Sequence, residues 1–355
     1  MSLTTIDWFV GGIMTSEKMT AVVVTAPGQF EIRDVAVPVP GPDDVLIRVH
    51  HSSICGSDLR LIKGSMEDIN FPLIPGHEWS GEVVEAPERY QHLVGQLVVS
   101  DILQSCDSCR FCLRGYRNLC DGLDEPGISV NGAFAEYIIV RARNVYSLPI
   151  GLPTLNACMV EPLSVVLYAL ELLPVNCGER VAIFGGGGIG QLLAQAVKIA
   201  GASKVVIIDH HDERLSIAKK LGADEVINSL RTDPVLALSG DSELGPDLVF
   251  DAAGNAEAFL SSLEVVNSGG RVGVIGYSGR QEISIRPTTF MRKLIQVQGV
   301  LSPTSSWTKA IDLISRQEVK VGPLLTHQMP LKKFPMAFKM MSDRAEGIIR
   351  PVLQP

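Results

Sequence analysis

Short apolar runs recur through the first part of the chain, where Pro and Gly separate them. They lie at residues 21–24, 45–50, 81–85, 96–100 and 134–140. The intervening segments contain few of the three- and four-residue apolar spacings that a helix requires, so the pattern is typical of an antiparallel, barrel-like sheet. We therefore predict a β-rich domain over residues 19–170.

The pattern changes near residue 176. Continuous apolar runs at 180–184, 205–209, 248–251, 271–275 and 295–299 now alternate with helical patterns, among them 189–199 and 212–221. Continuous apolar strands separated by amphipathic helices predict a doubly wound parallel sheet, and hence an α/β protein. We assign this second domain to residues 171–302. Two domains also suit a chain of 355 residues.

The two ends of the chain have less pattern. A helical pattern at 307–315 and a Pro-containing tail make up the C-terminal segment, residues 303–355. Residues 1–18 precede the first strand pattern and lack both a basic lead and a long apolar core. We expect them to form a loosely ordered extension rather than a signal peptide.

Composition narrows the classes of partner. The net charge is −8 and the basic residues form no cluster, so we expect no nucleic-acid partner. The longest apolar runs have the length of strands, so we expect no membrane span. Seven cysteines are present and four fall close together, which in a chain without an export signal favours metal binding over disulfides and predicts a cytoplasmic protein.

A glycine-rich segment follows the apolar run at 180–184 and opens a predicted helix. Its G-x-G-x-x-G spacing is formed by Gly185, Gly187 and Gly190, with Gly188 and Ile189 between the last two. Glycines at this spacing let the backbone approach a pyrophosphate, which then lies on the N–H groups of the helix N-terminus. The segment predicts a dinucleotide site; a glycine-rich turn without a ligand is the alternative.

An acidic residue completes this pattern. Asp209 ends the next apolar run, nineteen residues after Gly190. Its carboxylate is expected to accept hydrogen bonds from the adenosine ribose and to repel a 2′-phosphate, which favours NAD over NADP. Arg214 and His210 are expected beside the same ribose, and Arg214 leaves NADP open.

Four cysteines form a compact motif within residues 101–121. Cys106, Cys109 and Cys112 are spaced C-x-x-C-x-x-C, and Cys120 follows after seven residues. Four thiolates on one loop can enclose a metal ion in a closed tetrahedron, which is typical of a structural zinc. An iron–sulfur cluster and unliganded cysteines are the alternatives.

A second set of potential metal ligands is dispersed. Cys55 follows a strand pattern, His77 and Glu78 are adjacent, and Glu161 lies much further along. Mixed sulfur, nitrogen and oxygen donors suit a catalytic zinc, which keeps one position open for water or substrate. The residues alone do not group these four, because they are more than a hundred positions apart and an isolated Cys or Glu is more often structural.

Together the motifs are similar to those of the zinc-containing medium-chain alcohol dehydrogenase family. They are Cys-Gly-Ser-Asp at 55–58, Gly-His-Glu at 76–78, the four-cysteine lobe and the glycine motif. The resemblance implies a GroES-like β-barrel catalytic domain, a Rossmann domain, and a final segment that returns to the catalytic domain. It further implies two zinc ions per chain. Cys55 and His77 would hold the catalytic ion, with Glu78 and Glu161 as alternating carboxylate partners.

The resemblance also implies a mechanism. Zinc would act as a Lewis acid on a substrate hydroxyl, Ser57 would accept its proton, and hydride would pass to the nicotinamide. Asp58 would brace the loop. Many relatives have a His where this chain has Arg60, so Ser57 is expected to pass its proton to a ribose hydroxyl or to water.

Two other functions are the alternatives to this enzyme. Zinc-free reductases of the superfamily lack the Gly-His-Glu ligands and the lobe. A non-catalytic zinc module, a function of another class, would not require Cys55, Ser57 and His77.

The surroundings of Cys55, Trp79 and Glu161 resemble a narrower group, the 2-deoxy-scyllo-inosamine dehydrogenases of aminoglycoside antibiotic biosynthesis. This resemblance implies oxidation of one hydroxyl of an aminocyclitol or a related cyclic polyol. A sorbitol- or threonine-type dehydrogenase is the alternative. We expect a small-molecule substrate and a homodimer or homotetramer.

Overall fold

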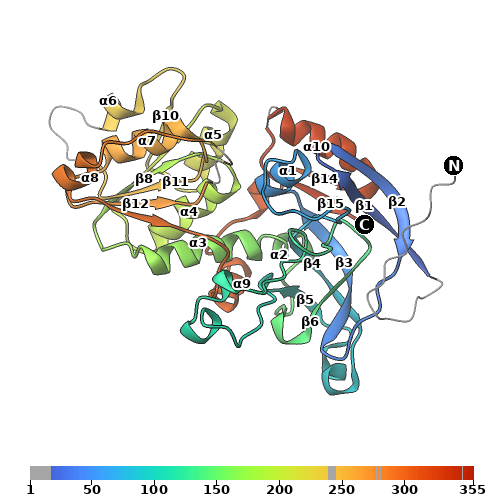
Figure 1. The fold of residues 1–355 in the computed structure, drawn as a ribbon. Coiled ribbons are helices and arrows are strands. Elements are labelled where there is room, and N and C mark those ends of the chain that lie inside the picture. Colours follow the sequence, from blue (N-terminus) through green and yellow to red (C-terminus); the bar gives the residue numbers. More distant parts are fainter. Residues whose placement is uncertain (1–16, 239–244, 277–278, 280, 346) are drawn as a thin grey trace.

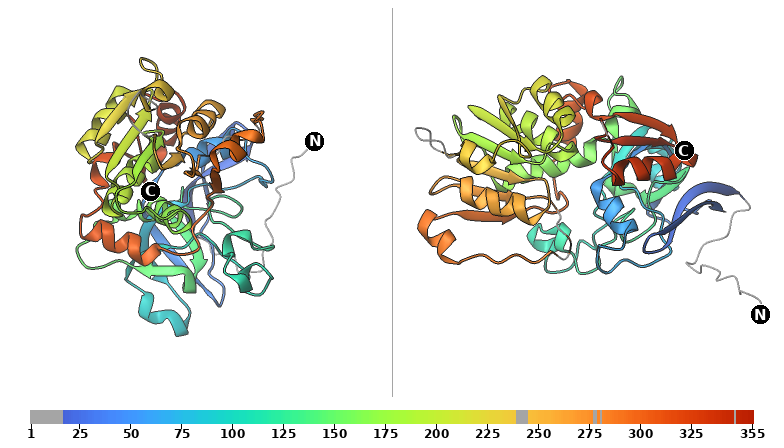
Figure 2. Two further views of the ribbon diagram at one scale, coloured as in Figure 1. Left: turned by 90° about the vertical axis from the view of Figure 1, so that its left-hand side faces the viewer. Right: turned by 90° about the horizontal axis from the view of Figure 1, so that it is seen from above.

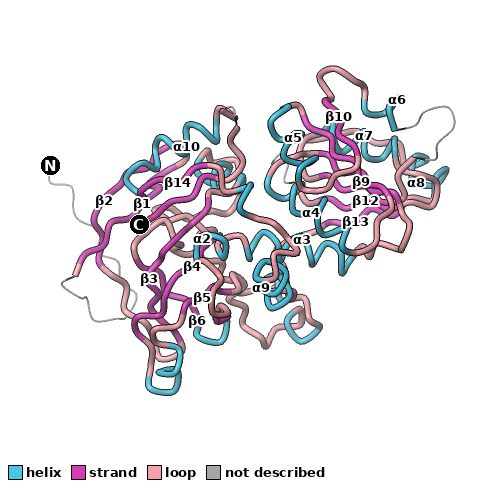
Figure 3. The backbone as a smooth tube through the Cα atoms, turned by 180° about the vertical axis from the view of Figure 1, so that it is seen from behind, coloured by secondary structure: helices cyan, strands magenta, loops and turns pink. Residues whose placement is uncertain are grey.

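The computed structural model describes residues 17–238, 245–276, 279, 281–345 and 347–355. Two lobes lie on either side of helix α3 (Val160–Leu172), which runs between them (Figure 1). One lobe is built on a largely antiparallel sheet and the other on a parallel sheet. Figure 3 shows from behind that the strands of the two sheets lie in separate lobes. The predicted α/β architecture is confirmed. The prediction for residues 1–18 lies almost wholly outside the described residues.

The first lobe contains a seven-stranded sheet with the order β14-β15-β3-β4-β5-β7, in which β6 also pairs with β3. All its pairs are antiparallel except β14 with β15. Its strands are β3 (Asp44–Ser53), β4 (Glu78–Glu85), β5 (Leu97–Ser100), β6 (Tyr137–Arg141), β7 (Val145–Ser147), β14 (His327–Pro330) and β15 (Pro351–Gln354). A separate antiparallel pair consists of β1 (Lys18–Ala26) and β2 (Gln29–Ala36). Helices α1 (Gly56–Ile62), α2 (Thr154–Ala157) and α10 (Phe334–Ser342) accompany these strands.

Strand β3 holds this lobe together because it pairs with β4, β6 and β15. Its Ile47 is completely buried and contributes to an apolar cluster with Val83 and Ile138 from the neighbouring strands. Because β15 comes from the last residues of the chain, the C-terminal segment completes the sheet that the N-terminal third began. The apolar pattern indicated β1, β3, β4, β5 and β6, but it missed β2, in which apolar and charged residues alternate.

The second lobe is a six-stranded parallel sheet with the order β10-β9-β8-β11-β12-β13. Its strands are β8 (Arg180–Phe184), β9 (Lys204–Asp209), β10 (Glu225–Asn228), β11 (Leu248–Asp251), β12 (Arg271–Val274) and β13 (Gln296–Gly299). Its helices are α4 (Gly188–Ile199), α5 (Asp212–Lys220), α6 (Pro234–Leu238), α7 (Ala256–Val265) and α8 (Thr288–Lys293). The strand order reverses between β8 and β11, which is where such sheets bind dinucleotides. Figure 2 shows this lobe from two further sides.

One apolar core joins the two lobes. It includes Leu163 on α3, Leu193 on α4 and Trp307 at the start of α9 (Trp307–Ser315). Among the described residues, one helical segment, Thr154–Leu172, has the length and apolar composition of a membrane span, but 67% of the window is buried inside the protein. This burial identifies it as the core helix of the two-lobed fold.

Candidate active site

The four predicted lobe cysteines converge on one point. The Sγ atoms of Cys106 and Cys120 are 3.4 Å apart, those of Cys109 and Cys112 are 3.5 Å apart, and those of Cys106 and Cys112 are 4.0 Å apart. All four lie within 4.8 Å of one another. Zn–S bonds of about 2.3 Å in a tetrahedron separate sulfur atoms by about 3.8 Å, so the set fits zinc with no position left over. Hydrogen bonds from Ser108 and Cys109 also lower the pKa of Cys106 to about 6, which favours the ligating thiolate.

Buried and half-buried ionic contacts hold this lobe against the first sheet. Arg117 donates to the carboxylate of Asp101 over 2.7 Å and to the carbonyl oxygen of Leu103 over 2.8 Å. Arg141 and Arg143 both donate to the carbonyl oxygen of Ser105, over 2.8 and 2.6 Å. These contacts lie beside the cysteine cluster, so they fix the position of the four-cysteine lobe relative to the sheet.

The dispersed ligands meet where β3 and β4 pair. Ser53 at the end of β3 lies opposite Glu78 at the start of β4, and Cys55 follows at the N-cap of α1. This register brings Cys55, His77 and Glu78 together, with their ligating atoms within 4.8 Å of one another. A thiolate, an imidazole and a carboxylate at this separation fit a catalytic zinc that keeps one position open.

Asp58 and Ser57 set the orientation of the His77 ring. The Cys55 N–H donates to Asp58 Oδ2 over 2.7 Å, while Asp58 Oδ1 lies 3.3 Å from His77 Nδ1. Both of the latter atoms are buried without a hydrogen-bond partner among the described residues. The other ring nitrogen, Nε2, lies 3.2 Å from Ser57 Oγ. A carboxylate behind a histidine fixes its tautomer and aims its second nitrogen at a metal, and Asp58 is placed for this role as well as for bracing the loop.

Arg350, a residue that the sequence analysis missed, holds Glu78. Its Nη1 lies 2.7 and 2.8 Å from the two Glu78 carboxylate oxygens, and Ser53 Oγ also donates to Glu78. Glu78 is 0% exposed and Arg350 is 4% exposed. Because Arg350 is 272 residues from Glu78 along the chain, no motif or spacing in a single sequence could have predicted this pair.

Glu161 occupies a different place in the site. It lies in the first turn of α3, is buried, and lines the same cleft as Cys55 and His77, but it is not in the group of ligating atoms within 4.8 Å. Among the described residues, its carboxylate makes no hydrogen bond or ion pair. Burial raises the pKa of Glu161 to about 7.

Charge inside the cluster favours the ligating thiolate of Cys55 and, at the same time, a protonated ring on His77. Burial alone would raise the pKa of Cys55, but the Arg350 charge and the hydrogen bond with His77 leave it well below its usual range. Burial would likewise lower the pKa of His77, yet Asp58 and Cys55 leave it raised. The thiolate and imidazolium thus stabilise each other, and a metal cation can take the place of the ring proton.

The glycine motif forms the turn that the sequence predicts. Gly185 has a φ of +102°, and a Cβ there would lie 2.8 Å from the Ala253 nitrogen. A Cβ on Gly190 would lie 1.8 Å from the Gly185 carbonyl oxygen, so only glycine allows α4 to approach the strand. Gly187, at the N-cap of α4, faces open space, which suits a pyrophosphate on the helix N-terminus. A Cβ on Gly188 would lie 2.3 Å from Arg350 Nε, so Arg350 lies between this loop and Glu78.

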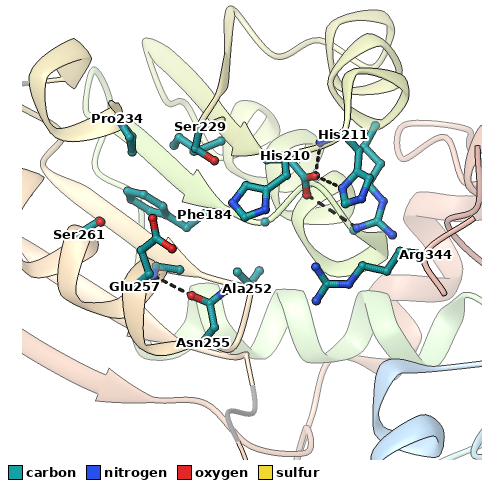
Figure 4. Close-up of a pocket in the computed structure, with 17 residues that line it drawn as sticks. Phe184, His210, His211, Ser229, Pro234, Ala252, Asn255, Glu257, Ser261 and Arg344 are labelled. Atoms are coloured by element: carbon teal, nitrogen blue, oxygen red, sulfur yellow. Dashed lines mark hydrogen bonds and ion pairs between the residues drawn. The ribbon is translucent and has the colours of Figure 1, made fainter. Parts of the chain in front are cut away.

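A pocket beside β9 has the position of an adenosine site. Asp209 accepts hydrogen bonds from the N–H groups of Gly186 over 2.7 Å and of His211 over 2.8 Å, and Arg214 lies 3.8 Å from it. Burial would raise the pKa of Asp209, but these partners lower it, so the carboxylate is ionised. In Figure 4, His210 and Arg344 reach into this pocket from different elements. Arg344, from the C-terminal segment, was not predicted.

A second cavity of about 420 Å³ joins the cofactor loop to the dispersed ligands. It is lined by Cys55, Ser57, His77 and Glu161 on one side and by Gly187, Gly188, Ile189 and Ile275 on the other. Glu125 and Ser302 also line it, and neither stands out in the sequence. The arrangement brings a metal-ligand set and the phosphate-binding end of a dinucleotide site to one cleft between the lobes.

Comparison with known proteins agrees with this geometry. The pattern of the alcohol dehydrogenase GroES-like domain matches residues 41–150, and that of a zinc-binding dehydrogenase matches residues 188–316. An L-threonine 3-dehydrogenase of Coxiella burnetii is 33% identical over 339 residues, covering 93% of this chain and 97% of its own. D-arabinitol dehydrogenase 1 of Uromyces fabae is 30% identical over 92% of this chain and 95% of its own.

A similar solved structure comes from Sinorhizobium meliloti and is described as a zinc-binding dehydrogenase with NADP bound. It superposes with a TM-score of 0.90 at 29% identity and covers 96% of this chain and all of its own. The similarity therefore extends over both lobes and the cleft between them.

Proposed function

The chain belongs to the zinc-containing medium-chain alcohol dehydrogenase family, and we propose that it oxidises a secondary hydroxyl of a cyclic polyol or aminocyclitol with NAD as the hydride acceptor. The observation that carries this proposal is the meeting of Cys55, His77 and Glu78 within 4.8 Å at a cleft that also contains the phosphate-binding loop. Zinc at these ligands would supply the Lewis acidity that makes a hydroxyl acidic, and the dinucleotide would take up the hydride.

The chain's own residues position the reactants. Ser57 Oγ, 3.2 Å from the ring of His77, is placed to accept the hydroxyl proton at the edge of the cleft. Asp58 holds both the Cys55 backbone and the His77 ring, and so fixes the geometry of two ligands at once. Arg60, which also lines the cleft, is not a proton acceptor. The Ser57 proton would therefore leave through a ribose hydroxyl or water.

We infer that Glu78 and Glu161 have unequal roles. Both oxygens of Glu78 are already bound by Arg350, whereas the Glu161 carboxylate has no hydrogen bond or ion pair among the described residues. Glu161 would thus be the carboxylate still available to a metal held by Cys55 and His77. Glu78 is instead held in a fixed position beside Cys55 and His77 by its contacts with Arg350.

Cofactor choice rests on Asp209. Its lowered pKa keeps a negative charge beside the adenosine pocket, which supports NAD. Arg214, Arg344 and His210 line the same pocket and would favour a 2′-phosphate, and the Sinorhizobium relative was solved with NADP. We propose NAD because Asp209 lies directly at the end of β9, where a ribose hydroxyl is bound in this fold.

The proposed substrate class has two supports. The neighbourhoods of Cys55, Trp79 and Glu161 lead us to expect an aminocyclitol, and one relative is named for the polyol arabinitol, whereas relatives named for threonine favour the alternative substrate. The cavity of about 420 Å³ also contains carboxylate, hydroxyl and guanidinium groups, set in a largely apolar lining, that can bind the hydroxyls of a polyol.

A substrate panel tests the proposal. Zinc-loaded enzyme is supplied with cyclic polyols, aminocyclitols, sorbitol, threonine and simple primary alcohols, with NAD or NADP, and nicotinamide reduction is followed by absorbance. We expect the highest kcat/KM with a cyclic polyol or aminocyclitol and NAD. Turnover of threonine or primary alcohols alone would contradict the substrate class, and a tenfold higher kcat/KM with NADP would contradict the cofactor.

We further propose that the protein is cytoplasmic and that its domain limits lie near residues 19, 171 and 303. We also propose that it forms a homodimer or homotetramer. Strand β13 is an edge of the parallel sheet, and apolar side chains are exposed on it and beside it, namely Met291, Leu294, Val297 and Leu301. An apolar edge strand favours pairing with a second chain. Sedimentation of the purified protein measures the assembly.

A further inference from the structure

Glu125 places a carboxylate in the cleft without belonging to the metal-ligand set. It lies in the loop between the four-cysteine lobe and β6, and it lines the same cavity as Ser57 and His77. The charge on His77 affects the ionisation of Glu125, and the charge on Glu125 in turn affects the ionisation of Glu161. The carboxylate is therefore within electrostatic reach of the reacting centre.

The Glu125 side chain is held by a serine from the other lobe. Ser302, which follows β13, donates from Oγ to Glu125 Oε1 over 2.9 Å, and the Ser302 carbonyl accepts from Asn118 of the cysteine lobe over 3.1 Å. On the backbone side, the Glu125 N–H donates to Ser129 Oγ over 2.8 Å. Among the residues that the structure describes, no hydrogen bond or ion pair engages the second oxygen, Oε2. One oxygen is thus fixed and the other is available to a ligand.

The surroundings favour a cationic partner for that oxygen. Ile102, Ile128 and Leu301 line the same cavity, and burial raises the pKa of Glu125 although Ser302 and His77 act in the opposite direction. A carboxylate that has lost part of its hydration gains most from a charged donor, because such hydrogen bonds are about twice as strong as neutral ones. No Lys or Arg in the described part of the chain supplies that donor.

We propose that Glu125 is the specificity-determining residue that binds an ammonium group of the substrate, so that amine-bearing cyclic polyols are preferred over their hydroxyl counterparts. The inference rests on the proposed function, because it assigns the substrate's amine to a site in the same cleft as the hydroxyl that is oxidised. Glu125, Cys55 and His77 all line this one cavity of about 420 Å³.

The test compares two matched substrates, 2-deoxy-scyllo-inosamine and 2-deoxy-scyllo-inositol, in which a hydroxyl replaces the amine. Initial rates are measured with NAD, and each compound is also titrated calorimetrically into zinc-loaded enzyme holding NADH. We expect wild type to prefer the amine by about tenfold or more. Glu125→Gln keeps an acceptor for Ser302 and removes the charge. It should lower kcat/KM for the amine by about 10- to 100-fold, mainly through KM, and leave the hydroxyl compound within about threefold.

Glu171→Gln is the matched control, because Glu171 also accepts hydrogen bonds from serines, Ser305 and Ser306, but lies outside the cleft. It should leave the amine preference unchanged, and both variants should retain wild-type zinc content and NADH affinity. A wild-type enzyme without amine preference, or a preference that survives Glu125→Gln, overturns the inference while the proposed function stands. If neither compound is oxidised, the proposed function fails, and the calorimetric preference still decides the role of Glu125.

Discussion

The four-cysteine lobe and the cluster around Cys55 both gather metal-binding side chains, but they are assembled in opposite ways. The lobe takes four like ligands from one loop, and several of its sulfur atoms are accessible to solvent. The other cluster takes unlike ligands from the N-cap of α1 and from the start of β4, and both His77 and Glu78 are buried. The four cysteines of the lobe can enclose an ion completely, whereas the cluster opens on a cleft of about 420 Å³.

The difference shows what each region has to do. Identical ligands close in sequence need only a short loop, and a filled tetrahedron leaves no room for substrate. A catalytic ion needs an open position and surrounding charges that tune it. Such charges come both from nearby residues, here Asp58, and from distant parts of the chain, here Arg350. The contrast predicts that variants of the cluster change chemistry and that variants of the lobe change stability.

The largest effect is expected for the anchoring ligands. Cys55→Ala or His77→Ala removes a strong donor, so each should lose one of two zinc ions and lower kcat by at least about a thousandfold, or 4 kcal/mol of barrier. The lobe should keep its ion. Elemental analysis and initial rates on the same preparation measure both, and full activity in Cys55→Ala would place the reacting site elsewhere.

Arg350→Met should have the next largest effect. Because Arg350 binds both oxygens of the completely buried Glu78, its removal leaves an uncompensated charge. Such losses cost about 3–5 kcal/mol of unfolding free energy, measurable by urea titration of zinc-loaded enzyme. Adding Glu78→Gln should recover part of that stability. NADH affinity should also fall, since Arg350 contacts the glycine loop. If the single and double variants are equally stable, the ion pair is not the cause.

The sequence predicted the parts of this protein whose signal is local. The cysteine spacing, the glycine motif and the continuous apolar strands of the parallel sheet are each contained within a few dozen residues. The α/β fold and the zinc-dependent dehydrogenase family followed from them and are confirmed. The individual roles of Cys55, Ser57 and His77 remain predictions, as do the domain limits.

What could not be predicted depends on tertiary contacts. Arg350 meets Glu78 only because β15 pairs with β3, and Glu125 meets Ser302 only because the two lobes face each other. Neither pair has a spacing rule, since any arginine or serine of the chain could have filled these positions. Strand β2 was missed for another reason: it is an edge ribbon with little buried surface.

Glu161→Gln tests the mobile side of the cluster and should have a smaller effect than loss of an anchor. The amide is isosteric, and Cys55, His77 and Glu78 remain, so zinc content should stay at two per chain. Loss of the carboxylate that can approach and leave the metal should lower kcat by about one to three decades, or 1.4–4 kcal/mol of barrier. Rates and metal content together decide this, and unchanged kcat would remove Glu161 from the mechanism.

The smallest effect on turnover is expected for Cys106→Ser, which tests the lobe. Cys106 Sγ lies 3.4 Å from Cys120 and 4.0 Å from Cys112, so its loss opens the tetrahedron and should release the lobe zinc. Because the lobe is also held by Arg117 on Asp101, the cleft should keep its shape. At low temperature, kcat should then stay within about threefold, which corresponds to less than about 0.7 kcal/mol of barrier. The cost should appear instead as a lower Tm, since a structural zinc contributes folding free energy directly.

The matched control is Cys177→Ser, at an exposed cysteine outside both clusters. It should change neither zinc content nor Tm. Retention of two zinc ions by Cys106→Ser would contradict the closed four-cysteine site, and loss of turnover as complete as in Cys55→Ala would erase the distinction between the two regions.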